Sequence, residues 1–381
     1  MIVRAYKTEL KLNNKQRAYL GRCAGAARFV YNWALADRKQ RYEDKGENTN
    51  IYEQKRRFNA LKHAEYPWLA EVPYALVEQA FRNLDTAYNN FFRRVKKGET
   101  PGFPKFKSRH KGIGSFTLRG CIHITETHIK LPRLGWLRLK ERGYLPTNGT
   151  RVLSVNVSEQ AGRWYVSVQV EQEHHTPPPS VQAAIGIDLG IKSLAVCSDG
   201  RAYENPKALY VAERKMARLQ RELSRRKKGS ANRNKTKAKI AKLHGQIANI
   251  RRFNLHQVSH DVTSEPRPGA IVVEDLNVAG MMKNHCLARA TSDSGMSELR
   301  RQIEYKAGWQ GIEIVTADRW YPSSKTCSEC GSIKSDLALS DRTYHCAECG
   351  AVIDRDLNAA RNLASLVKDV NRETHGNCLG S

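Results

Sequence analysis

The chain has 381 residues, and 64 lysines and arginines against 38 aspartates and glutamates give it a formal net charge of +26. This length predicts two or three domains, and a hydrophobic content of 40% is too high for a disordered basic tail. No run approaches about 18 consecutive apolar residues, and residues 1–16 lack the apolar core of a secretory signal. The composition therefore argues against a membrane span and favours a polyanionic partner, nucleic acid before membrane.

The nine cysteines indicate a reducing compartment. Four of them form two CxxC pairs, and the other five are scattered singly: Cys23, Cys121, Cys197, Cys286 and Cys378. An odd number without close, even spacing is a poor disulfide framework. We therefore expect a cytoplasmic protein with one cysteine-bound metal.

The amino-terminal half combines a helical segment with short strands. Residues 2–12 alternate as a strand does, Asn13 and Asn14 can cap a helix running to about residue 41, and a second helix is predicted over about 73–97. Residues 114–172 carry short β-rich runs typical of a small antiparallel barrel or sandwich, into which the first strand could pair. Residues 173–182 (EHHTPPPSVQ) form a Pro-rich linker, the clearest boundary in the chain.

An α/β pattern follows the linker. Strands are predicted at 183–188, 193–198, 270–274 and 312–316. A long helical region covers about 207–260, a further helix lies near 296–308, and a last helix begins at about Leu357. A cysteine-rich segment occupies residues 321–350, between the last strand and the last helix.

The cysteine-rich segment has the spacing of a metal site. Its four thiols are Cys327, Cys330, Cys346 and Cys349, two CxxC knuckles separated by a 15-residue interval. Four thiolates leave no open coordination position, so we expect a structural zinc ion. The alternatives are an iron–sulfur site or redox-active dithiols.

Two predicted strands end in an acidic residue. Asp188 ends the strand in GIDLG, and Glu274 ends IVVE just before Asp275. A carboxylate at such a place is poorly explained by packing, because Asp is rarely buried unless it is paired or bound to a metal. Ribonuclease-H-like nucleases and actin-like ATPases both use a strand-end Asp, and an Asp that only caps a turn is a third possibility. The second strand-end acid favours the nuclease. An actin-like ATPase would need a second Gly-rich phosphate loop, and none follows residue 190.

A third acid lies at the start of the last helix, in Asp354-Arg355-Asp356. Asp356 directly precedes an apolar helical stripe and is our candidate, while Asp354 is expected at the end of the cysteine-containing ribbon that comes before the helix. The alternative is that Asp356 is only a helix N-cap. Three converging carboxylates repel one another unless cations lie between them, so the cluster predicts a two-metal Mg²⁺ site for phosphodiester hydrolysis.

Two further segments are candidates for nucleic-acid binding. Residues 212–252 hold 15 lysines and arginines against two glutamates and read as a helical hairpin with a break near Gly229-Ser230. The candidate contacts there are Arg225, Arg226, Lys227 and Lys228. In PGFPKFKSRHK (101–111), Phe103, Lys105 and Lys107 could stack on bases and clamp phosphates. The alternatives are a solvated charged face and a structured linker.

These motifs together resemble the TnpB (OrfB) proteins of insertion sequences, which are compact relatives of the type V CRISPR effector nucleases. The resemblance rests on GIDLGIKSLAV, VVEDLNVAGM, ADRWYPSSKTCSECG, CAECG and DRDLNAARNL, and it extends to NNKQRAYLGRCAGAARFVYNWAL and PGFPKFKSR. It implies catalytic acids at Asp188, Glu274 and Asp356, zinc on the four cysteines, a guide RNA from the transposon, and double-stranded target DNA read beside a short adjacent motif.

The resemblance also implies a domain plan. A wedge-type β-barrel (1–12 and 112–172) is split by a helical recognition segment (13–111). After the linker comes a RuvC-like, ribonuclease-H-like nuclease domain (183–320 and 351–381) with a zinc-ribbon insertion (321–350). We expect a monomeric, RNA-guided DNA endonuclease of a prokaryotic transposable element that acts at the nucleoid. The rival interpretations are a nuclease-silent RNA-guided regulator, a transposase that performs strand transfer, and an actin-like ATPase.

Overall fold

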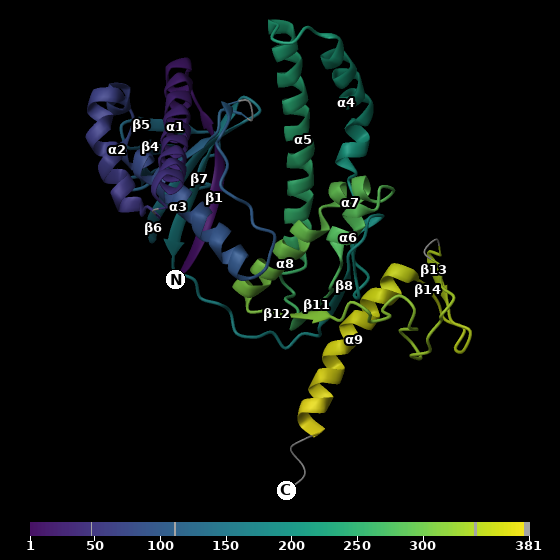
Figure 1. The fold of residues 1–381 in the computed structure, drawn as a ribbon. Helices are drawn as coiled ribbons and strands as arrows, with labels where there is room; N and C mark the ends of the chain where they lie inside the picture. The colour runs from purple at the N-terminus through teal and green to yellow at the C-terminus, as the bar shows by residue number, and fades with distance from the viewer. Residues whose placement is uncertain (47, 110–111, 339–340, 377–381) are drawn as a thin grey trace. The chain divides into compact units, whose positions relative to one another are not determined.

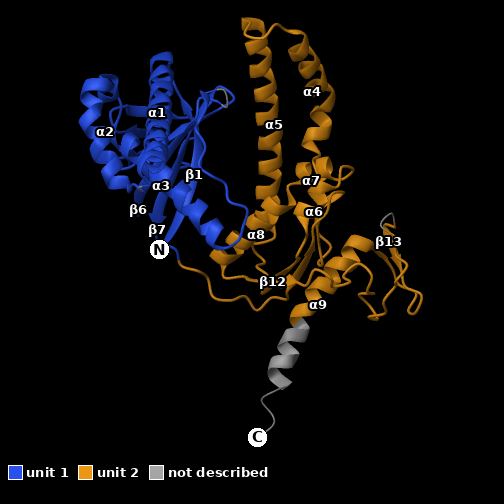
Figure 2. Ribbon diagram, in the orientation of Figure 1, with its two compact units in different colours: residues 1–174 blue, residues 175–381 orange. Residues whose placement is uncertain are grey.

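A computed structural model of the chain describes residues 1–46, 48–109, 112–338 and 341–376, with side chains described as far as residue 367. The chain divides into two compact units, residues 1–174 and 175–381 (Figure 2). The division falls between His174 and His175, inside the Pro-rich segment expected to be a linker. Within the described residues, no helix combines the length and apolar character that crossing a membrane requires.

The first unit contains a seven-stranded antiparallel sheet. Its strands are β1 (Ile2–Lys11), β2 (Ser115–Leu118), β3 (His123–Ile124), β4 (His128–Leu131), β5 (Gly135–Leu139), β6 (Thr150–Gln160) and β7 (Arg163–Gln172). They hydrogen-bond in the order β2-β6-β7-β1-β5-β4-β3. The first strand does pair with the later ones, because most of β1 lies along β7 and its last two residues pair with β5. Among the described residues no pairing joins β2 to β3, so a closed barrel remains a prediction.

The helices of the first unit lie between β1 and β2 in sequence: α1 (Asn14–Lys45), α2 (Ile51–Glu65), the 3-10 helix η1 (Pro67–Glu71) and α3 (Tyr74–Lys96) (Figure 1). Asn13 caps α1 as predicted, in a capping box with Gln16. The helix α2 was not predicted. It is held to α1 by Phe58, whose ring lies 4.8 Å from that of Trp33, and by Gln54, which donates to the Ala34 carbonyl at 2.8 Å.

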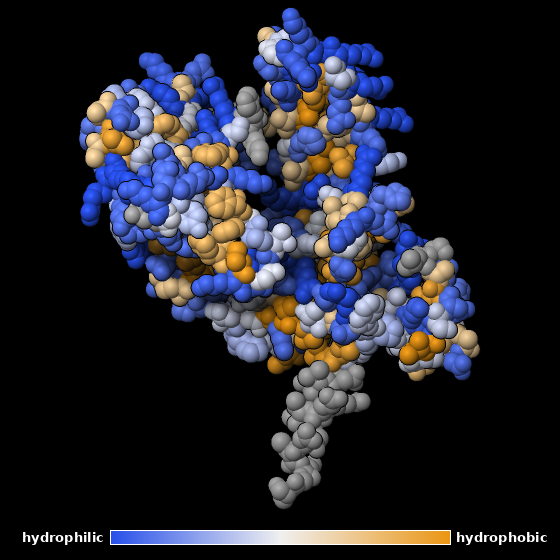
Figure 3. All heavy atoms as spheres, in the orientation of Figure 1, coloured by the Kyte–Doolittle hydropathy of each residue, from blue (hydrophilic) through white to orange (hydrophobic). Residues whose placement is uncertain are grey.

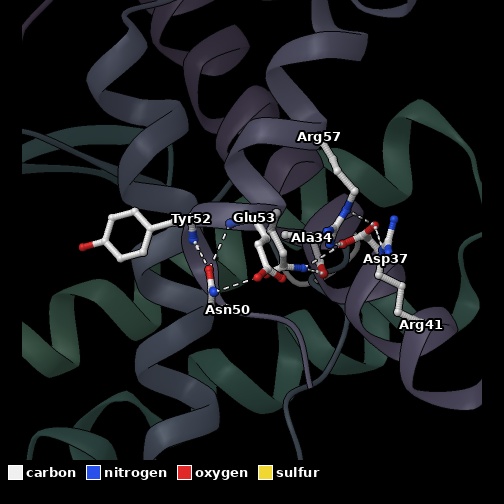
Figure 4. Close-up of polar contacts among 8 residues, drawn as sticks. Ala34, Asp37, Arg41, Asn50, Tyr52, Glu53 and Arg57 are labelled. Carbon is white, nitrogen blue, oxygen red and sulfur yellow. Dashed lines mark hydrogen bonds and ion pairs between the residues drawn. The ribbon is translucent and has the colours of Figure 1, made fainter. Parts of the chain in front are cut away.

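A cluster of ion pairs and hydrogen bonds links α1 to α2 (Figure 4). Asp37 on α1 lies 2.6 Å from Arg57 on α2 and 3.4 Å from Arg41, while Asn50 caps α2 by accepting from the amides of Tyr52 and Glu53. A carboxylate surrounded by two guanidinium groups satisfies its charge internally. These residues therefore orient the two helices and are not candidates for ligand binding.

The second unit is built on a five-stranded sheet of mixed direction. Its strands are β8 (Ile185–Asp188), β9 (Ser193–Cys197), β10 (Ala202–Glu204), β11 (Ala270–Glu274) and β12 (Glu313–Ala317), in the order β10-β9-β8-β11-β12. The strands β8, β11 and β12 run parallel, and β9 and β10 are antiparallel to their neighbours. The central strands are almost wholly apolar and buried, as expected for a sheet covered on both faces.

The other elements of the second unit are α4 (Ala208–Arg225), α5 (Ala231–Asp261), α6 (Val278–Lys283), α7 (Ala288–Ser294), α8 (Met296–Gln310), the ribbon β13 (Thr343–His345) with β14 (Val352–Asp354), and α9 (Arg355–Gly376). The helix α8 covers one side of the sheet through Leu299 and Ile303, which pack against Ile271 and Val273 of β11. On the other side, Leu363 of α9 packs with Val272. The break predicted near Gly229-Ser230 separates α4 from α5.

The helix α9 lies very close to β8. A Cβ atom added to Gly186 would lie 2.0 Å from the Ala360 carbonyl oxygen, 2.6 Å from the Ala364 nitrogen and 2.9 Å from the Leu363 Cβ. Glycine at position 186 therefore allows the backbone of the helix to lie directly on the strand. The side chain that follows two residues later on the same strand is Asp188.

We predict that Gly186→Ala destabilises the second unit by about 3 kcal/mol or more, because α9 must move to admit the methyl group. Thermal unfolding followed by circular dichroism measures the loss. Gly308→Ala is the matched control, since a Cβ there meets no atom within 4 Å on α8 and alanine favours a helix. Equal melting temperatures for Gly186→Ala and the wild type would contradict the packing described here.

Candidate functional site

The two strand-end acids lie on adjacent parallel strands. In the register of β8 and β11, Ile187 is opposite Val273, so Asp188 and Glu274 are the next residues along the two strands. Carboxyl ends of parallel strands meet at one edge of a sheet, where loops and helix ends can complete a site. Asp188 and Glu274 are therefore neighbours at this edge, and both side chains are only partly exposed.

The electrostatics of Asp188 show that the acids are close. Its pKa is raised from 3.8 to about 8, first by burial and then by the negative charges of Glu274, Asp356 and Asp354. The Arg355 guanidinium acts in the opposite direction and lowers the pKa. A carboxyl group held in a repulsive, partly desolvated cluster is suited to bind a cation, which would remove the repulsion.

The structure separates the roles of Asp354 and Asp356. Asp354 ends β14, is exposed, and accepts the backbone amides of Asp356 at 3.0 Å and Leu357 at 3.1 Å. These contacts make Asp354 the cap of α9. Asp356 lies in the first turn with its side chain 17% exposed and 3.4 Å from Arg355. Asp356 is therefore not the capping residue and remains our candidate for the third acid.

Glu274 and Asp275 are likewise distinguished by their partners. Asp275 forms ion pairs with Arg319 at 2.5 Å and with Arg300 at 3.7 Å. Glu274 instead accepts a hydrogen bond from the Ser323 hydroxyl at 2.5 Å, while its backbone carbonyl accepts from Arg300. The carboxylate of Asp275 is neutralised by arginines, and that of Glu274 is the one aligned with Asp188.

The four predicted cysteines converge on one point. Their sulfur atoms all lie within 4.8 Å of one another, and the Cys327–Cys349 and Cys330–Cys346 pairs are separated by 3.7 and 3.5 Å. Four sulfurs arranged tetrahedrally about zinc at roughly 2.3 Å would lie about 3.8 Å apart, so these residues fit the ion. The structure places a four-cysteine cluster of the zinc-ribbon kind between β12 and α9 in the chain.

The basic hairpin of α4 and α5 presents a hydrophilic surface around a narrow apolar seam (Figure 3). Arg225, Lys227 and Lys228 are exposed at its turn. Arg226 differs, because its guanidinium lies 2.5 Å from Glu222 and donates to the Asn232 carbonyl at 2.8 Å. Three of the four residues predicted to bind nucleic acid are thus exposed to solvent, while Arg226 stabilises the turn between α4 and α5.

The aromatic–basic segment of the first unit is ordered by the helices it contacts. Phe103 lines a cavity of about 560 Å³, and it packs edge-on against Tyr88 and Phe91. The Lys107 ammonium lies 4.0 Å from the centre of the Tyr31 ring, and its burial lowers the pKa of Lys107. Lys105 is exposed. Phe103, Lys105 and Lys107 are all exposed residues, Phe103 at the rim of the cavity. The ammonium of Lys107 is in addition engaged with the Tyr31 ring of its own helix bundle.

Four residues that contact the carboxylates or the segment around Ser323 were not singled out from the sequence: Ser323, Arg355, Asn358 and Asn362. Arg355 could have been noticed as the basic residue between two candidate acids. The two asparagines are spaced four apart on α9, so they lie on one helical face. Nothing in the local pattern reveals their partners, which belong to the segment around the first cysteine knuckle.

Three family models match the chain. A model described as a probable transposase of the OrfB type matches residues 167–285, a Cas12f1-like TNB domain matches 297–363, and a helix-turn-helix domain matches 1–47. The last description differs from the structure, in which one strand is followed by the single helix α1. Among solved structures, the fold is similar to that in a Cas12f1–sgRNA–target DNA complex, with a TM-score of 0.57, 15% identity and coverage of 95% of this chain and 98% of that one.

Two relatives establish the family. A Streptomyces pristinaespiralis protein named "Putative RNA-guided DNA endonuclease" is 39% identical over 95% of this chain and 89% of its own length. The Escherichia coli K12 protein InsQ, which carries the same description, is 34% identical over 95% and 91%. The chain belongs to the OrfB (TnpB) family, as the motifs of the sequence indicated.

We predict that the purified chain carries one zinc ion, and that Cys346→Ser lowers the zinc content and unfolds the cysteine segment, because folding and metal binding are coupled there. Inductively coupled plasma mass spectrometry gives the zinc-to-protein ratio. Cys121→Ser, at an exposed cysteine in the other unit, is the control and should retain the metal. Iron in place of zinc, or unchanged zinc in Cys346→Ser, would contradict this prediction.

We also predict that Asp188→Asn stabilises the magnesium-free protein at pH 8, by about 1–2 kcal/mol, because it removes a negative charge that is disfavoured first by burial and then by the neighbouring acids. The pKa of Asp188 is raised in the folded state, so its unfavourable contribution grows as the pH rises from 3.8 toward about 8. The difference between variant and wild type should therefore be much smaller at pH 5.

Melting curves at both pH values, with and without added Mg²⁺, measure this effect. Mg²⁺ should raise the melting temperature of the wild type and leave Asp188→Asn unchanged, since only the wild type keeps all three acids. Asp336→Asn, an exposed acid outside the cluster, controls for the change in net charge. A wild type that is insensitive to Mg²⁺ would argue against a cation site at these carboxylates.

Proposed function

We propose that the protein is an RNA-guided DNA endonuclease of a transposable element, which cleaves guide-matched DNA beside a short adjacent motif. The observation that carries this proposal is the convergence of Asp188, Glu274 and Asp356 at one edge of the second unit's sheet, with the pKa of Asp188 raised to about 8. The relatives named as RNA-guided DNA endonucleases support the reaction class, and so does the fold shared with Cas12f1.

We assign the domains on the same basis. The second unit would be a RuvC-like nuclease domain with a zinc-ribbon insertion at residues 321–350, since its mixed five-stranded sheet carries acids at the ends of β8 and β11. The first unit would be a wedge-type barrel with α1–α3 as the recognition segment, supported by the pairing of β1 with β7 and β5 around the inserted helices.

In the proposed reaction, phosphodiester hydrolysis takes place at the three carboxylates of the second unit. Asp188, Glu274 and Asp356 would bind two divalent cations, and hard oxygen ligands of this kind suit Mg²⁺. When bound, Mg²⁺ would orient the attacking water and stabilise the negative charge on the leaving 3′ oxygen. Arg355 limits the negative charge of the cluster, and Arg300 fixes the end of β11 through the Glu274 carbonyl. Zinc on the four cysteines would be structural, because four thiolates leave no position for substrate.

Both nucleic acids would be held mainly through their backbones. The exposed Arg225, Lys227 and Lys228 would supply cationic contacts for phosphates. Phe103 could stack on an unpaired base at the rim of its cavity, and the exposed Lys105 could contact a phosphate. Sequence information would then come from pairing between the guide RNA and the target strand. We propose that the active species is a monomer that works in the cytoplasm on the nucleoid.

Two rival functions use the same fold. A nuclease-silent regulator would bind guide and target without cutting, and the intact set of three acids disfavours it. A transposase would use the same carboxylates for strand transfer, as the description of one matching family model indicates. The relatives from Streptomyces pristinaespiralis and Escherichia coli, by their names, favour the guided nuclease over both.

The decisive experiment begins with the RNA that copurifies with the protein. We predict that sequencing it returns one enriched RNA from the protein's own locus, and that the loaded complex cuts a matching plasmid when Mg²⁺ is present. Asp188→Ala should lower cleavage by at least about a thousandfold while leaving RNA and DNA binding within about twofold, because it removes a carboxylate from the cation site and no backbone contact.

Each rival has its own outcome in this experiment. Guide-dependent binding without cleavage by the wild type would identify a regulator, and joining of DNA ends in place of cutting would identify a transposase. The absence of an enriched RNA, or cutting that does not depend on the guide, would overturn the proposal. Loss of binding together with cleavage in Asp188→Ala would make that acid structural.

A further inference from the structure

Ser323 connects the cysteine cluster to the carboxylate site. It lies in the second unit, four residues before Cys327, and is 5% exposed. Its hydroxyl donates to Oε1 of Glu274 at 2.5 Å, the distance of a charge-assisted hydrogen bond. One carboxylate oxygen of Glu274 is thereby occupied, and the side chain is held in one orientation at the end of β11.

The backbone around Ser323 is in turn clamped by two buried asparagines of α9. The side-chain amide nitrogen of Asn362 donates to the backbone carbonyls of Ser323 at 2.7 Å and of Thr326 at 2.6 Å. Asn358 donates to the Thr326 carbonyl at 2.7 Å and accepts the Ser328 amide at 2.9 Å. Asn358 and Asn362 are 0% and 5% exposed. Loss of these hydrogen bonds would leave buried polar groups without partners, because water does not reach them, and would therefore cost free energy.

The same helix also carries the third candidate acid. Asp356 lies two residues before Asn358, and Cys327 directly follows Thr326, the residue that both asparagines bind. One rigid helix thus fixes Asp356, the start of the first cysteine knuckle and, through Ser323, the Glu274 side chain. Removal of any of these contacts should change the positions of the carboxylates more than it changes the stability of the fold.

We propose that Ser323 is a positioning residue for the nuclease site: it holds Oε1 of Glu274 so that the other oxygen is presented to a divalent cation. The asparagine clamp of Asn358 and Asn362 keeps Ser323 in place and makes this contact depend on the folded cysteine segment. This inference rests on the proposed function, in which Glu274 is a cation ligand. A purely structural Ser323 would affect stability without changing cation affinity.

Direct Mn²⁺ binding to the full-length protein tests the role of Ser323 independently of cleavage. Electron paramagnetic resonance of free Mn²⁺ gives the dissociation constant without nucleic acid. We expect Ser323→Ala to weaken Mn²⁺ binding about tenfold, the effect typical of removing a residue that orients a ligand. Asn362→Ala should act in the same direction. Ser324→Ala, the same change one residue along, should bind Mn²⁺ as the wild type does.

Folding is checked on the same samples. Zinc content and the melting temperature of Ser323→Ala should stay close to those of the wild type, and the titration is run well below the melting temperature. Should the alanine variant not fold, Ser323→Cys keeps a side chain of similar size with a much weaker donor, and it should also weaken Mn²⁺ binding.

The possible results separate this inference from the proposed function. Wild-type Mn²⁺ affinity in a folded Ser323 variant would overturn the positioning role and leave the nuclease proposal standing. A wild-type protein whose Mn²⁺ binding is unaffected by Asp188→Ala has no cation site at the carboxylates, and that result would overturn both. Weakened binding in Ser323→Ala with full zinc occupancy would support the positioning role.

Discussion

The contact on which the second unit depends is the packing of α9 directly against β8 at Gly186. No side chain separates the two backbones there, so the position of the helix along the strand is closely defined. Asp188 follows on the strand and Asp356 lies at the beginning of the helix. The separation of two candidate catalytic acids is therefore determined by apolar packing beneath them rather than by any bond between them.

This packing holds together charges that repel one another. In the absence of a cation, burial raises the pKa of Asp188 to about 8 together with the negative charges of Glu274 and Asp356, in that order of effect. The free energy that maintains this arrangement against the repulsion has to come from the apolar core on both faces of the sheet. If the three acids bind cations as we propose, the metal-free protein would be less stable and the site would strongly prefer divalent cations.

Much of this architecture was predictable from the sequence, because short-range patterns determine it. The acids at the ends of buried strands, the cysteine spacing, the cap at Asn13 and the hairpin break near Gly229 each follow from local physical rules. Which basic residues of the α4–α5 hairpin are exposed to solvent was less predictable. Arg226 belongs to an uninterrupted basic run, and only the folded turn brings Glu222 and the Asn232 carbonyl within its reach.

The features that sequence reasoning missed depend on contacts between distant segments. The helix α2 is held by Gln54 and Phe58 against α1, and its own apolar pattern is weak. Ser323 and the two asparagines of α9 have partners 30 to 49 residues away, so no local periodicity marks them. The catalytic role of the three acids is our proposal, and it is supported by their positions at the ends of β8 and β11 and in the first turn of α9.

The order of the elements along the chain has a consequence for synthesis on the ribosome. The strands that carry Asp188 and Glu274 are made well before α9, which brings Asp356 and covers Gly186. A nascent chain that ends before α9 has two acids on a sheet whose α9 face is uncovered, and it lacks the third acid. The candidate carboxylate cluster is thus completed late in translation, and a chain that ends before α9 contains two of its three acids.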